Sequence, residues 1–440
     1  MTRNNTTFGR GAPTWANACV GDNGSPNYWD YAKGFSQAAN LLLDQVLRDG
    51  GVSLSVDELI YPVCFNMRHS VELRLKGAIS ELIALEQYRN RRLDFDLAGS
   101  HDIGNIWAFF SQNSARIDNR YASINTRLNT KIIDIAEIDA TGQTFRYPFD
   151  TDSQKHLVDV EIINFVRLRS SFSELEKALD DLHNLNNHLR VEYSFGSFTR
   201  SLSRKDIFDV ASQLPNRSCW SEEPFEETRE TIKRQFNLTN SELSKSIKII
   251  EKHFELAPVI GCSVALLGAS ERDVATFVKL WFKLHDLPDD TATSAVIGSS
   301  ELGLEEMLEG MVRSEQVCRN VWEEISPKLT AEMLAGLSAL FYFGRDLDFS
   351  ERYILIFERH LREAKIAFES SDDSVKAHFF HIFNKPNALY NILRSLYFIK
   401  KSEFAEELVS EYDLGRKFSW LDDARNRVIF RKLKHWGYAT

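Results

Sequence analysis

The chain has 440 residues, of which 43% are hydrophobic and 26% are charged, and it carries a formal net charge of -10 at pH 7. This composition is typical of a folded globular protein and excludes a largely disordered chain. The length exceeds what one hydrophobic core usually supports, so we expect two or more domains. The acidic balance argues against a surface that binds nucleic acid everywhere, although a local basic groove is compatible with it.

Cysteine usage and the lengths of the apolar runs indicate the cellular compartment. Five cysteines, an odd number, are spread far apart along the chain, which favours reduced thiols over a disulfide framework. No stretch approaches the ~20 apolar residues that a membrane-spanning helix needs, and the N-terminus lacks the apolar core of a signal peptide. We therefore expect a cytoplasmic protein that has no membrane partner.

The first part of the chain predicts an extended arm and then helices. Residues 1–26 are rich in Asn, Gly, Thr and Pro and are expected to form a weakly ordered arm. A continuous apolar face over residues 27–47, ended by a Gly-Gly pair, predicts the first helix. A second helix is expected over residues 62–89, with Pro62 in its first turn, where the missing N–H costs nothing.

Three further signals complete an N-terminal domain. Ser100 is expected to cap a helix that runs past Trp107. A Tyr-Pro pair breaks the helical pattern within residues 141–150, which predicts a loop. A strong amphipathic repeat over residues 158–190 predicts one more long helix. Together these elements place a helical domain at residues 27–193.

The second half of the chain predicts a linker and then an array of short helices. Clusters of Gly, Pro and polar residues interrupt the helical period over residues 194–238, so we expect a linker or hinge there. Residues 239–440 show short helical stretches separated by turn signals, which predicts a C-terminal helical domain. The fold class is therefore predicted to be mainly α, with an N-terminal helical bundle followed by a C-terminal array of short helical hairpins.

The second predicted helix concentrates four chemically capable side chains. Arg68, Glu72 and Lys76 are spaced four residues apart, and His69 lies three residues before Glu72, so all four occupy adjacent rows of one helix. His101 is a further candidate near the start of the next helix. Arg68 could bind a phosphate, His69 or His101 could transfer protons near neutral pH, and Glu72 could orient an imidazole.

These residue types match metal-independent cleavage of RNA, with Lys76 stabilising charge on the substrate. The alternative is a structural ladder of ion pairs on an ordinary helix, because oppositely charged residues four apart are common there.

The loop at residues 141–150 adds Arg146 and Asp150 as candidate substrate-binding residues. Functional side chains concentrate on loops that a rigid scaffold holds, so this loop could cover the motif helix as a lid. The alternative is a structural loop that its aromatic residues hold in place.

Two basic stretches, residues 200–205 and residues 416–434, could follow a nucleic-acid backbone, and the second is interleaved with aromatic residues. Acidic residues interrupt the second stretch, so a solvated helix face is the alternative. The chain has no Gly-rich phosphate loop, no Gly-x-Ser-x-Gly sequence and no His-Glu-x-x-His pair. We expect neither a metal nor a cofactor.

One family resemblance rests on the motif helix. Residues 61–76 read Tyr-Pro-x-x-Phe-x-x-Arg-His-x-x-Glu-Leu-x-Leu-Lys and are followed by Gly-x-His-Asp at residues 99–102 and by Trp107. This arrangement resembles the HEPN-like helical domains of bacterial defence and toxin proteins, over about residues 27–190. Many proteins of that superfamily are metal-independent RNA endonucleases, in which an Arg and a His with four to six residues between them line a site between two copies of the domain. No histidine of this chain follows an arginine at that spacing.

Two functions remain as hypotheses. The resemblance implies a bacterial antiviral-defence effector that cleaves or binds RNA without a metal through its HEPN-like domain. The alternative is a non-catalytic assembly or adaptor subunit, which dimerises through helix faces and binds a partner protein. The acidic charge, the long helical second half and the missing Arg and His spacing favour the second hypothesis.

Overall fold

The computed structural model describes residues 7–150, 152–287 and 304–430, with only the backbone described for residues 304–310. The first six residues of the predicted arm and the end of the basic stretch after residue 430 lie outside the described residues. Within the described ranges all regular elements are helices, and the only β pairing is an isolated bridge between Phe149 and Lys155. The prediction of a mainly α protein is confirmed.

The chain divides into two compact units, Met1–Ser194 and Phe195–Thr440. The first unit contains α1 (Tyr28–Asp49), α2 (Val56–Tyr88), α3 (Ile103–Ile117), α4 (Tyr121–Asp139) and α5 (Phe165–Ser194). Ahead of them, residues 7–26 are exposed and form only the short 3-10 helix η1 (Thr14–Ala16).

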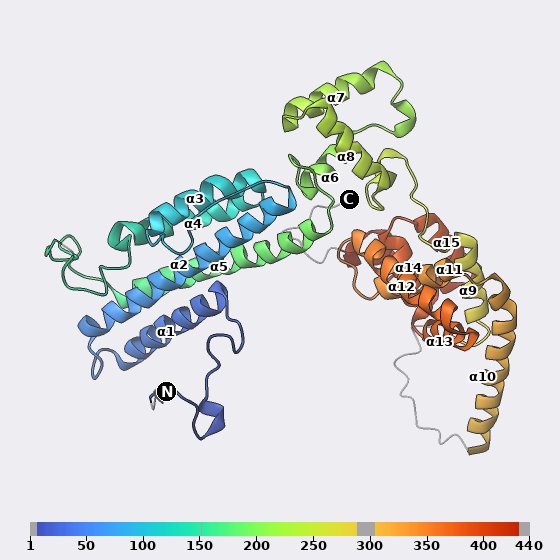
Figure 1. Ribbon diagram of the computed structural model, residues 1–440, viewed down its shortest axis with the longest axis horizontal. Coiled ribbons are helices and arrows are strands. Elements are labelled where there is room, and N and C mark those ends of the chain that lie inside the picture. Colours follow the sequence, from blue (N-terminus) through green and yellow to red (C-terminus); the bar gives the residue numbers. More distant parts are fainter. Residues whose placement is uncertain (1–6, 151, 288–303, 431–440) are drawn as a thin grey trace. The chain divides into compact units, whose positions relative to one another are not determined.

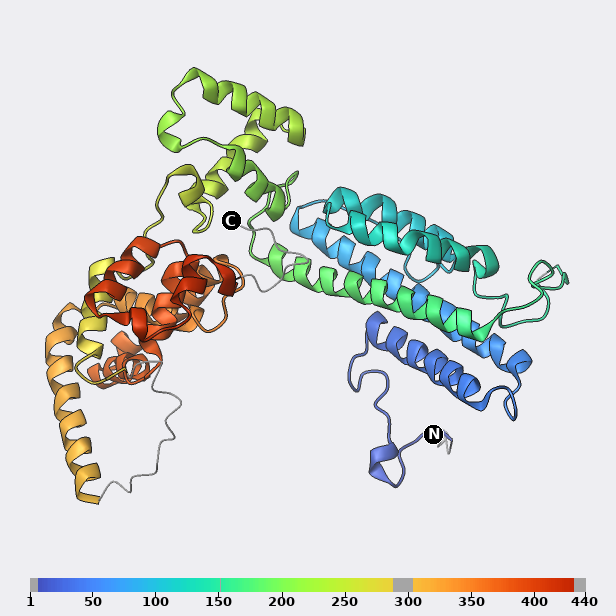
Figure 2. The same ribbon diagram turned by 180° about the vertical axis from the view of Figure 1, so that it is seen from behind.

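Helix α2 is the centre of the first unit. It packs against α1, α3 and α5, and Figures 1 and 2 show it running lengthwise between α1 and the α3–α4 pair. Because neighbours cover several of its faces, buried residues occur on more than one helical row. The core of the unit includes fully buried side chains from all five helices, among them Leu43, Val71, Leu82, Phe110, Tyr121, Leu128, Phe172 and Leu185.

Helix α1 begins and ends where the sequence indicates. The Asn27 side chain accepts hydrogen bonds from two backbone N–H groups of the first turn, and the Asp30 side chain accepts one from the Asn27 backbone N–H. Gly50 ends the helix in the left-handed conformation, with φ at 64°.

Three predicted boundaries are wrong because local capping groups decide them. Helix α2 begins at Val56 rather than near Pro62, since Ser55 accepts a hydrogen bond from the Glu58 N–H and Pro62 is tolerated inside the helix. Asp102, not Ser100, caps α3 by accepting from the Asn105 N–H. Helix α5 begins at residue 165, seven residues after the predicted start, and the Asn164 side chain accepts from the Arg167 N–H at 3.0 Å.

Residues 194–238, where we expected a linker or hinge, contain folded elements. They form α6 (Arg204–Gln213), η2 (Arg217–Cys219) and α7 (Glu223–Phe236), which precede α8 (Asn240–Lys252) and η3 (Ala257–Ile260). A capping box of Ser203 and Asp206 starts α6. Apolar residues of α6, α7 and α8, including Ile207, Ile232 and Leu243, pack into one buried cluster. This cluster makes the stretch part of the second unit.

The rest of the second unit is a layered set of short helices around α11. Its elements are α9 (Glu271–Trp281), α10 (Leu304–Ile325), η5 (Ser326–Lys328), α11 (Ala331–Phe343), α12 (Glu351–Ser370), α13 (Asp372–Phe383), α14 (Ala388–Phe398), α15 (Ser402–Glu411), η6 (Leu414–Arg416), α16 (Leu421–Arg425) and η7 (Val428–Phe430). Helix α11 contacts α12, α13 and α14, and ten of its thirteen residues are buried. Among the described residues, no helix has the length and the apolar composition to cross a membrane.

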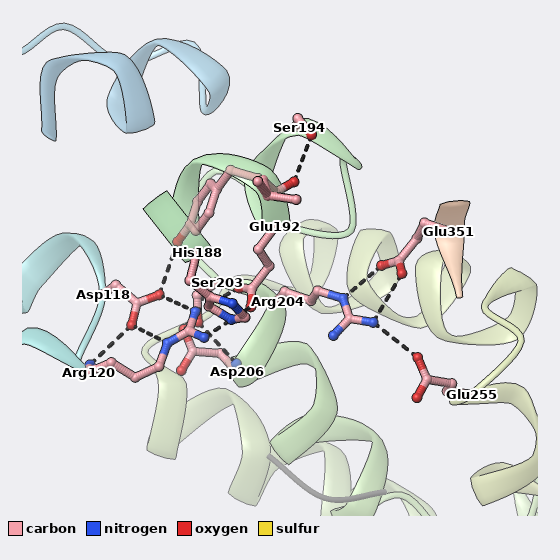
Figure 3. A network of polar contacts seen from close by, with 12 residues as sticks. Asp118, Arg120, His188, Glu192, Ser194, Ser203, Arg204, Asp206, Glu255 and Glu351 are labelled. Atoms are coloured by element: carbon pink, nitrogen blue, oxygen red, sulfur yellow. Dashed lines mark hydrogen bonds and ion pairs between the residues drawn. The ribbon is translucent and has the colours of Figure 1, made fainter. Parts of the chain in front are cut away.

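Each unit also contains an arginine whose side chain is largely buried and joins distant helices (Figure 3). In the first unit, Arg120 makes paired hydrogen bonds to Asp118 and to Glu192, at 2.6 to 3.0 Å, and so connects the start of α4 to the end of α5. In the second unit, Arg204 of α6 lies between Glu351 of α12 and Glu255, with its Nε 2.7 Å from Glu351 Oε1. These paired charges hold helices that are remote in sequence.

A glycine in α11 allows a close approach of the backbone at residues 267–269, and it yields a stability prediction. A Cβ at Gly336 would lie 2.6 Å from the Ala269 backbone N and would also meet the Leu267 carbonyl oxygen. We therefore expect Gly336→Ala to destabilise the protein by about 2 kcal/mol through overpacking, although alanine normally favours a helix. Urea denaturation followed by circular dichroism measures this difference.

The matched control for that experiment is Gly415→Ala, because a Cβ at Gly415 meets nothing within 4 Å. Its denaturation midpoint should stay at the wild-type value. Equal midpoints for Gly336→Ala and the wild type would contradict the close approach of α11 to residues 267–269.

Candidate functional site

The four candidate side chains of α2 meet around one carboxylate, that of Glu72. Lys76 Nζ lies 2.9 Å from Glu72 Oε1, and Arg68 Nη1 donates to Oε2. His69 Nδ1 lies 3.8 Å from Oε2. His101, which lies between α2 and α3, places its Nδ1 3.0 Å from Oε1. The structure thus brings together the four predicted catalytic residues and Lys76, with Glu72 at the centre.

Arg68 is used inside the fold rather than presented to a ligand. Arg68 is only 3% exposed, and four of the five N–H groups of its side chain donate to protein acceptors. Besides Glu72, these acceptors are the backbone oxygens of Asp139 at 3.2 Å, Ala140 at 2.6 Å and His101. The contact with phosphate that we expected of Arg68 would require these bonds to break. Arg68 therefore positions the site residues.

Glu72 is held as an anion by its neighbours. Burial alone would raise the pKa of this carboxyl group, but contact with His69 and Lys76, the charge of Arg68 and the hydrogen bond to His101 outweigh it and hold the pKa well below the usual range. An ionised carboxylate can only accept hydrogen bonds, so the ring proton of His101 lies on Nδ1. Nε2 is then the ring nitrogen that can accept a proton.

His101 is the accessible member of the cluster. Its side chain is 61% exposed, whereas the side chain of Glu72 is 4% exposed. Among the described residues, no hydrogen bond to its Nε2 is found. The backbone fixes its place: Arg68 binds the His101 carbonyl oxygen, and the Ile103 N–H donates to the Ala140 oxygen at 2.9 Å. This arrangement of carboxylate, imidazole and free Nε2 suits proton transfer.

His69 is framed by two aromatic residues that sequence reasoning did not select. Phe35 of α1 meets the imidazole edge-on at 4.4 Å between ring centroids, and Phe65 of α2 stacks on it at 5.7 Å. The side chain of His69 is 30% exposed. Phe65 lies four residues before His69, and this helical spacing was the available signal; the contact of Phe35 depends on how α1 packs.

The two candidate loop residues have different surroundings. The Arg146 guanidinium lies over the Phe65 ring, 5.6 Å from its centroid, so this end of the loop reaches α2. Arg146 also donates to the Tyr147 hydroxyl at 3.2 Å and remains accessible. Asp150 instead accepts from the backbone N–H groups of residues 152 and 154, at 2.9 and 2.8 Å. Asp150 thus closes its own turn and is not brought to Glu72.

A second cluster has the donor types of a metal site. His253, Glu255 and Glu351 place ligand-capable atoms within 4.8 Å of one another. Arg204 is bound to both carboxylates, and Arg427 lies 3.4 Å from Glu255. The positive charges of two arginines thus already neutralise the two carboxylates that would have to bind a metal cation. The cluster is best explained as a buried ion-pair network.

In the described part of the two predicted basic stretches, several cations are engaged in ion pairs. Arg204 is buried in the network above, and Lys205 pairs with Asp209 at 2.6 Å. In the second stretch, Arg425 pairs with Glu406 and with Asp422, both at 2.7 Å. These side chains are neutralised locally, which weakens the case for a nucleic-acid surface at either stretch.

Comparison with models of protein families, with curated proteins and with solved structures finds no match to this chain.

The Glu72 cluster predicts a specific dependence of stability on pH. Glu72→Gln should lower the free energy of unfolding by ~3 kcal/mol at pH 7, because it leaves Arg68 and Lys76 buried without their anion. The folded-state pKa of Glu72 is lower than the ordinary value of 4.5, so its stabilisation is complete above that pH and is lost as the pH falls below it. The difference between wild type and variant should therefore shrink below about pH 4.5.

Urea titrations at several pH values check this prediction. The control is Glu174→Gln, since Glu174 is exposed and pairs with Lys131 on the surface, so little change is expected. A difference between wild type and Glu72→Gln that grows as the pH falls would contradict the assignment of Glu72 as a stabilising anion.

Proposed function

We propose that this protein is an RNA-directed effector of the HEPN-like type, which cleaves RNA without a metal at the Glu72 cluster. The single observation that carries the proposal is the pair of a buried, ionised Glu72 and an exposed His101 whose Nε2 is free to exchange a proton. A role in bacterial antiviral defence is part of the same proposal and rests on the family resemblance.

The reaction would be transfer of the phosphoryl group within RNA. Nε2 of His101 accepts the proton of a ribose 2′-hydroxyl, and the resulting oxygen attacks the adjacent phosphorus. The bond from phosphorus to the 5′-oxygen of the next nucleotide breaks, which leaves a 2′,3′-cyclic phosphate. The departing 5′-oxygen takes a proton from His69, whose ring lies against the same Glu72 carboxylate. Neither redox change nor added co-reactant is needed.

The surrounding cations divide into two roles. Arg146 is accessible and lies over Phe65, which also stacks on His69, so its guanidinium can face the charge that develops on the phosphate. Arg68 and Lys76 are buried, and their role is to position Glu72 and, through it, the imidazoles. Asp150 has no part in this reaction scheme.

One observation favours the second candidate function, the non-catalytic assembly or adaptor subunit. Arg68, Glu72 and Lys76 form a closed set of buried ion pairs, as a purely structural ladder would. In that case the first unit would bind a protein partner or a second copy through its helix faces, and His101 would only satisfy a hydrogen bond of Glu72.

The decisive experiment is incubation of the purified protein with mixed cellular RNA in EDTA, followed on a denaturing gel. The wild type should cleave, and His101→Ala should reduce the rate by about 100-fold or more with an unchanged thermal midpoint. His69→Ala should also reduce the rate. The control is His378→Ala, because His378 is an exposed histidine of the second unit whose ring contacts a backbone oxygen.

Two outcomes would decide against catalysis at this cluster. Equal cleavage by the wild type and His101→Ala would remove His101 from the reaction. Intact RNA with every variant, together with a stable dimer or a protein complex in size-exclusion chromatography with light scattering, would favour the adaptor.

The positioning role of Arg68 gives a separate prediction. Arg68→Ala should lower the free energy of unfolding by ~3 kcal/mol, because it leaves Glu72 and three backbone oxygens without their donor. Thermal denaturation measures this loss. An inactive Arg68→Ala variant of wild-type stability would instead place Arg68 in contact with the substrate.

A further inference from the structure

A shallow groove on the second unit gathers arginines in a chain that is acidic overall. The end of α11 and the exposed side of α12 surround a hollow of about 770 Å³. Its lining includes Tyr342, Arg345, Arg352, Glu358, Arg359 and Arg362. Four guanidinium groups thus lie around one surface depression, and none of these arginines is among the site residues predicted from the sequence.

Helical spacing explains why these side chains share a face. Arg352, Arg359 and Arg362 of α12 are separated by seven and by three residues, which keeps them on neighbouring rows of the helix. Arg345 follows α11 in the turn that leads to α12, and it completes the rim. The pattern is visible in the sequence, although the turn that brings Arg345 to α12 is a feature of the fold.

Three of the four guanidinium groups are available to a ligand. Arg352 is engaged by Asp346 and by Asp348, the latter at 2.5 Å. For Arg345 and Arg362, which are exposed, no ion pair is found in the part of the chain that the structure describes. Within the described ranges, Arg359 has only a long ion pair, to Glu363 at 3.9 Å, and its Nη2 lies 3.2 Å from His360 Nε2. By contrast, Arg68, Arg120 and Arg204 are fixed in buried pairs.

An aromatic surface lies beside these charges. The Tyr342 ring stacks on His360 with centroids 4.7 Å apart, and its hydroxyl bonds His381 Nε2 at 2.8 Å. The Arg345 guanidinium lies 5.9 Å from the centroid of the same ring. Guanidinium groups beside an aromatic ring suit unpaired nucleic acid, because they bind phosphates and stack on bases.

We propose that this groove binds single-stranded RNA, with Arg345, Arg359 and Arg362 contacting successive phosphates and the Tyr342 side providing a stacking surface. The inference rests on the proposed action on RNA, and it names the part of the chain that would hold the substrate. An acidic protein segment is a poorer fit, because it has no flat bases to use the aromatic surface.

Glu358 allows a test in which the expected change in RNA binding has the opposite sign. It is an exposed carboxylate in the lining of the groove, and no ion pair of it is found among the described residues. It therefore opposes the binding of a polyanion. Neutralising Glu358 should strengthen RNA binding, whereas neutralising the arginines should weaken it.

Fluorescence anisotropy with a labelled twelve-nucleotide oligouridine probe tests the groove. The assay uses the whole 440-residue chain with His101→Ala, so that the probe stays intact. The triple variant Arg345→Ala/Arg359→Ala/Arg362→Ala should bind at least ~10-fold more weakly and should show a shallower salt dependence, by about one unit of slope for each phosphate that is no longer bound. Glu358→Gln should bind about 2-fold more tightly, as expected when one repelling charge is removed.

The matched control is Arg319→Ala, which removes an exposed arginine of α10 and should leave binding unchanged. Wild-type affinity of the triple variant would overturn the proposal, and so would stronger competition by poly-glutamate than by oligouridine. RNA binding at the groove and RNA cleavage at the Glu72 cluster are tested by different measurements. If the triple substitution weakens binding while the unmodified protein cleaves no RNA, the groove stands and the catalytic role of the Glu72 cluster falls.

Discussion

The buried guanidinium of Arg68 is the interaction on which the first unit depends. It joins three places in the fold: Glu72 one turn along α2, the last backbone oxygens of α4, and the carbonyl oxygen of His101 ahead of α3. The final carbonyls of a helix have no partner within it, and the helix dipole places negative charge there. A fixed cation at this position therefore satisfies the end of α4 and sets the distance from α2 to the chain before α3.

The turn that follows α4 is shaped around this cation. Gly142 has a φ of 78°, and a Cβ there would lie 3.1 Å from Arg68 Nη1. Glycine is thus required both for the left-handed backbone and for the space that Arg68 occupies. The loop that carries Arg146 back to α2 begins at this turn. Arg68 therefore fixes the starting point of that loop as well as the position of His101.

The sequence predicted the members of the cluster better than their environment. Spacing of three and four residues identified Arg68, His69, Glu72 and Lys76 as neighbours, because that relation is a property of any helix. It could not show that Arg68 and Lys76 are buried, since this depends on α1, α3 and α5 covering α2 from several sides. The contact of His101 with Glu72 joins residues far apart in sequence, and only the packing of α3 creates it.

Helix boundaries and the predicted linker were misjudged for a related reason. The sequence-based predictions placed helix boundaries mainly by proline and glycine. The observed helix starts are instead set by Ser55, Asp102 and the Ser203 capping box. The helices of residues 204–236 are short, and their stability comes from packing against α8 rather than from a long amphipathic repeat. The arginines of α12 escaped notice because they are scattered along the helix instead of forming a run.

Two hydrogen bonds hold the backbone around His101 in place. Arg68 donates to the carbonyl oxygen of residue 101, and the N–H of residue 103 donates to the Ala140 oxygen. The backbone on the C-terminal side of His101 therefore fixes the position of the imidazole. The connection over residues 90–98 precedes these anchors and contacts α3 through Phe95, whose ring centroid lies 4.5 Å from that of Phe109. Because the entropy of closing a loop grows only slowly with its length, this connection is the natural place for insertions and deletions among descendants of this sequence. Selection can therefore remodel the surface beside the imidazole without displacing the imidazole itself.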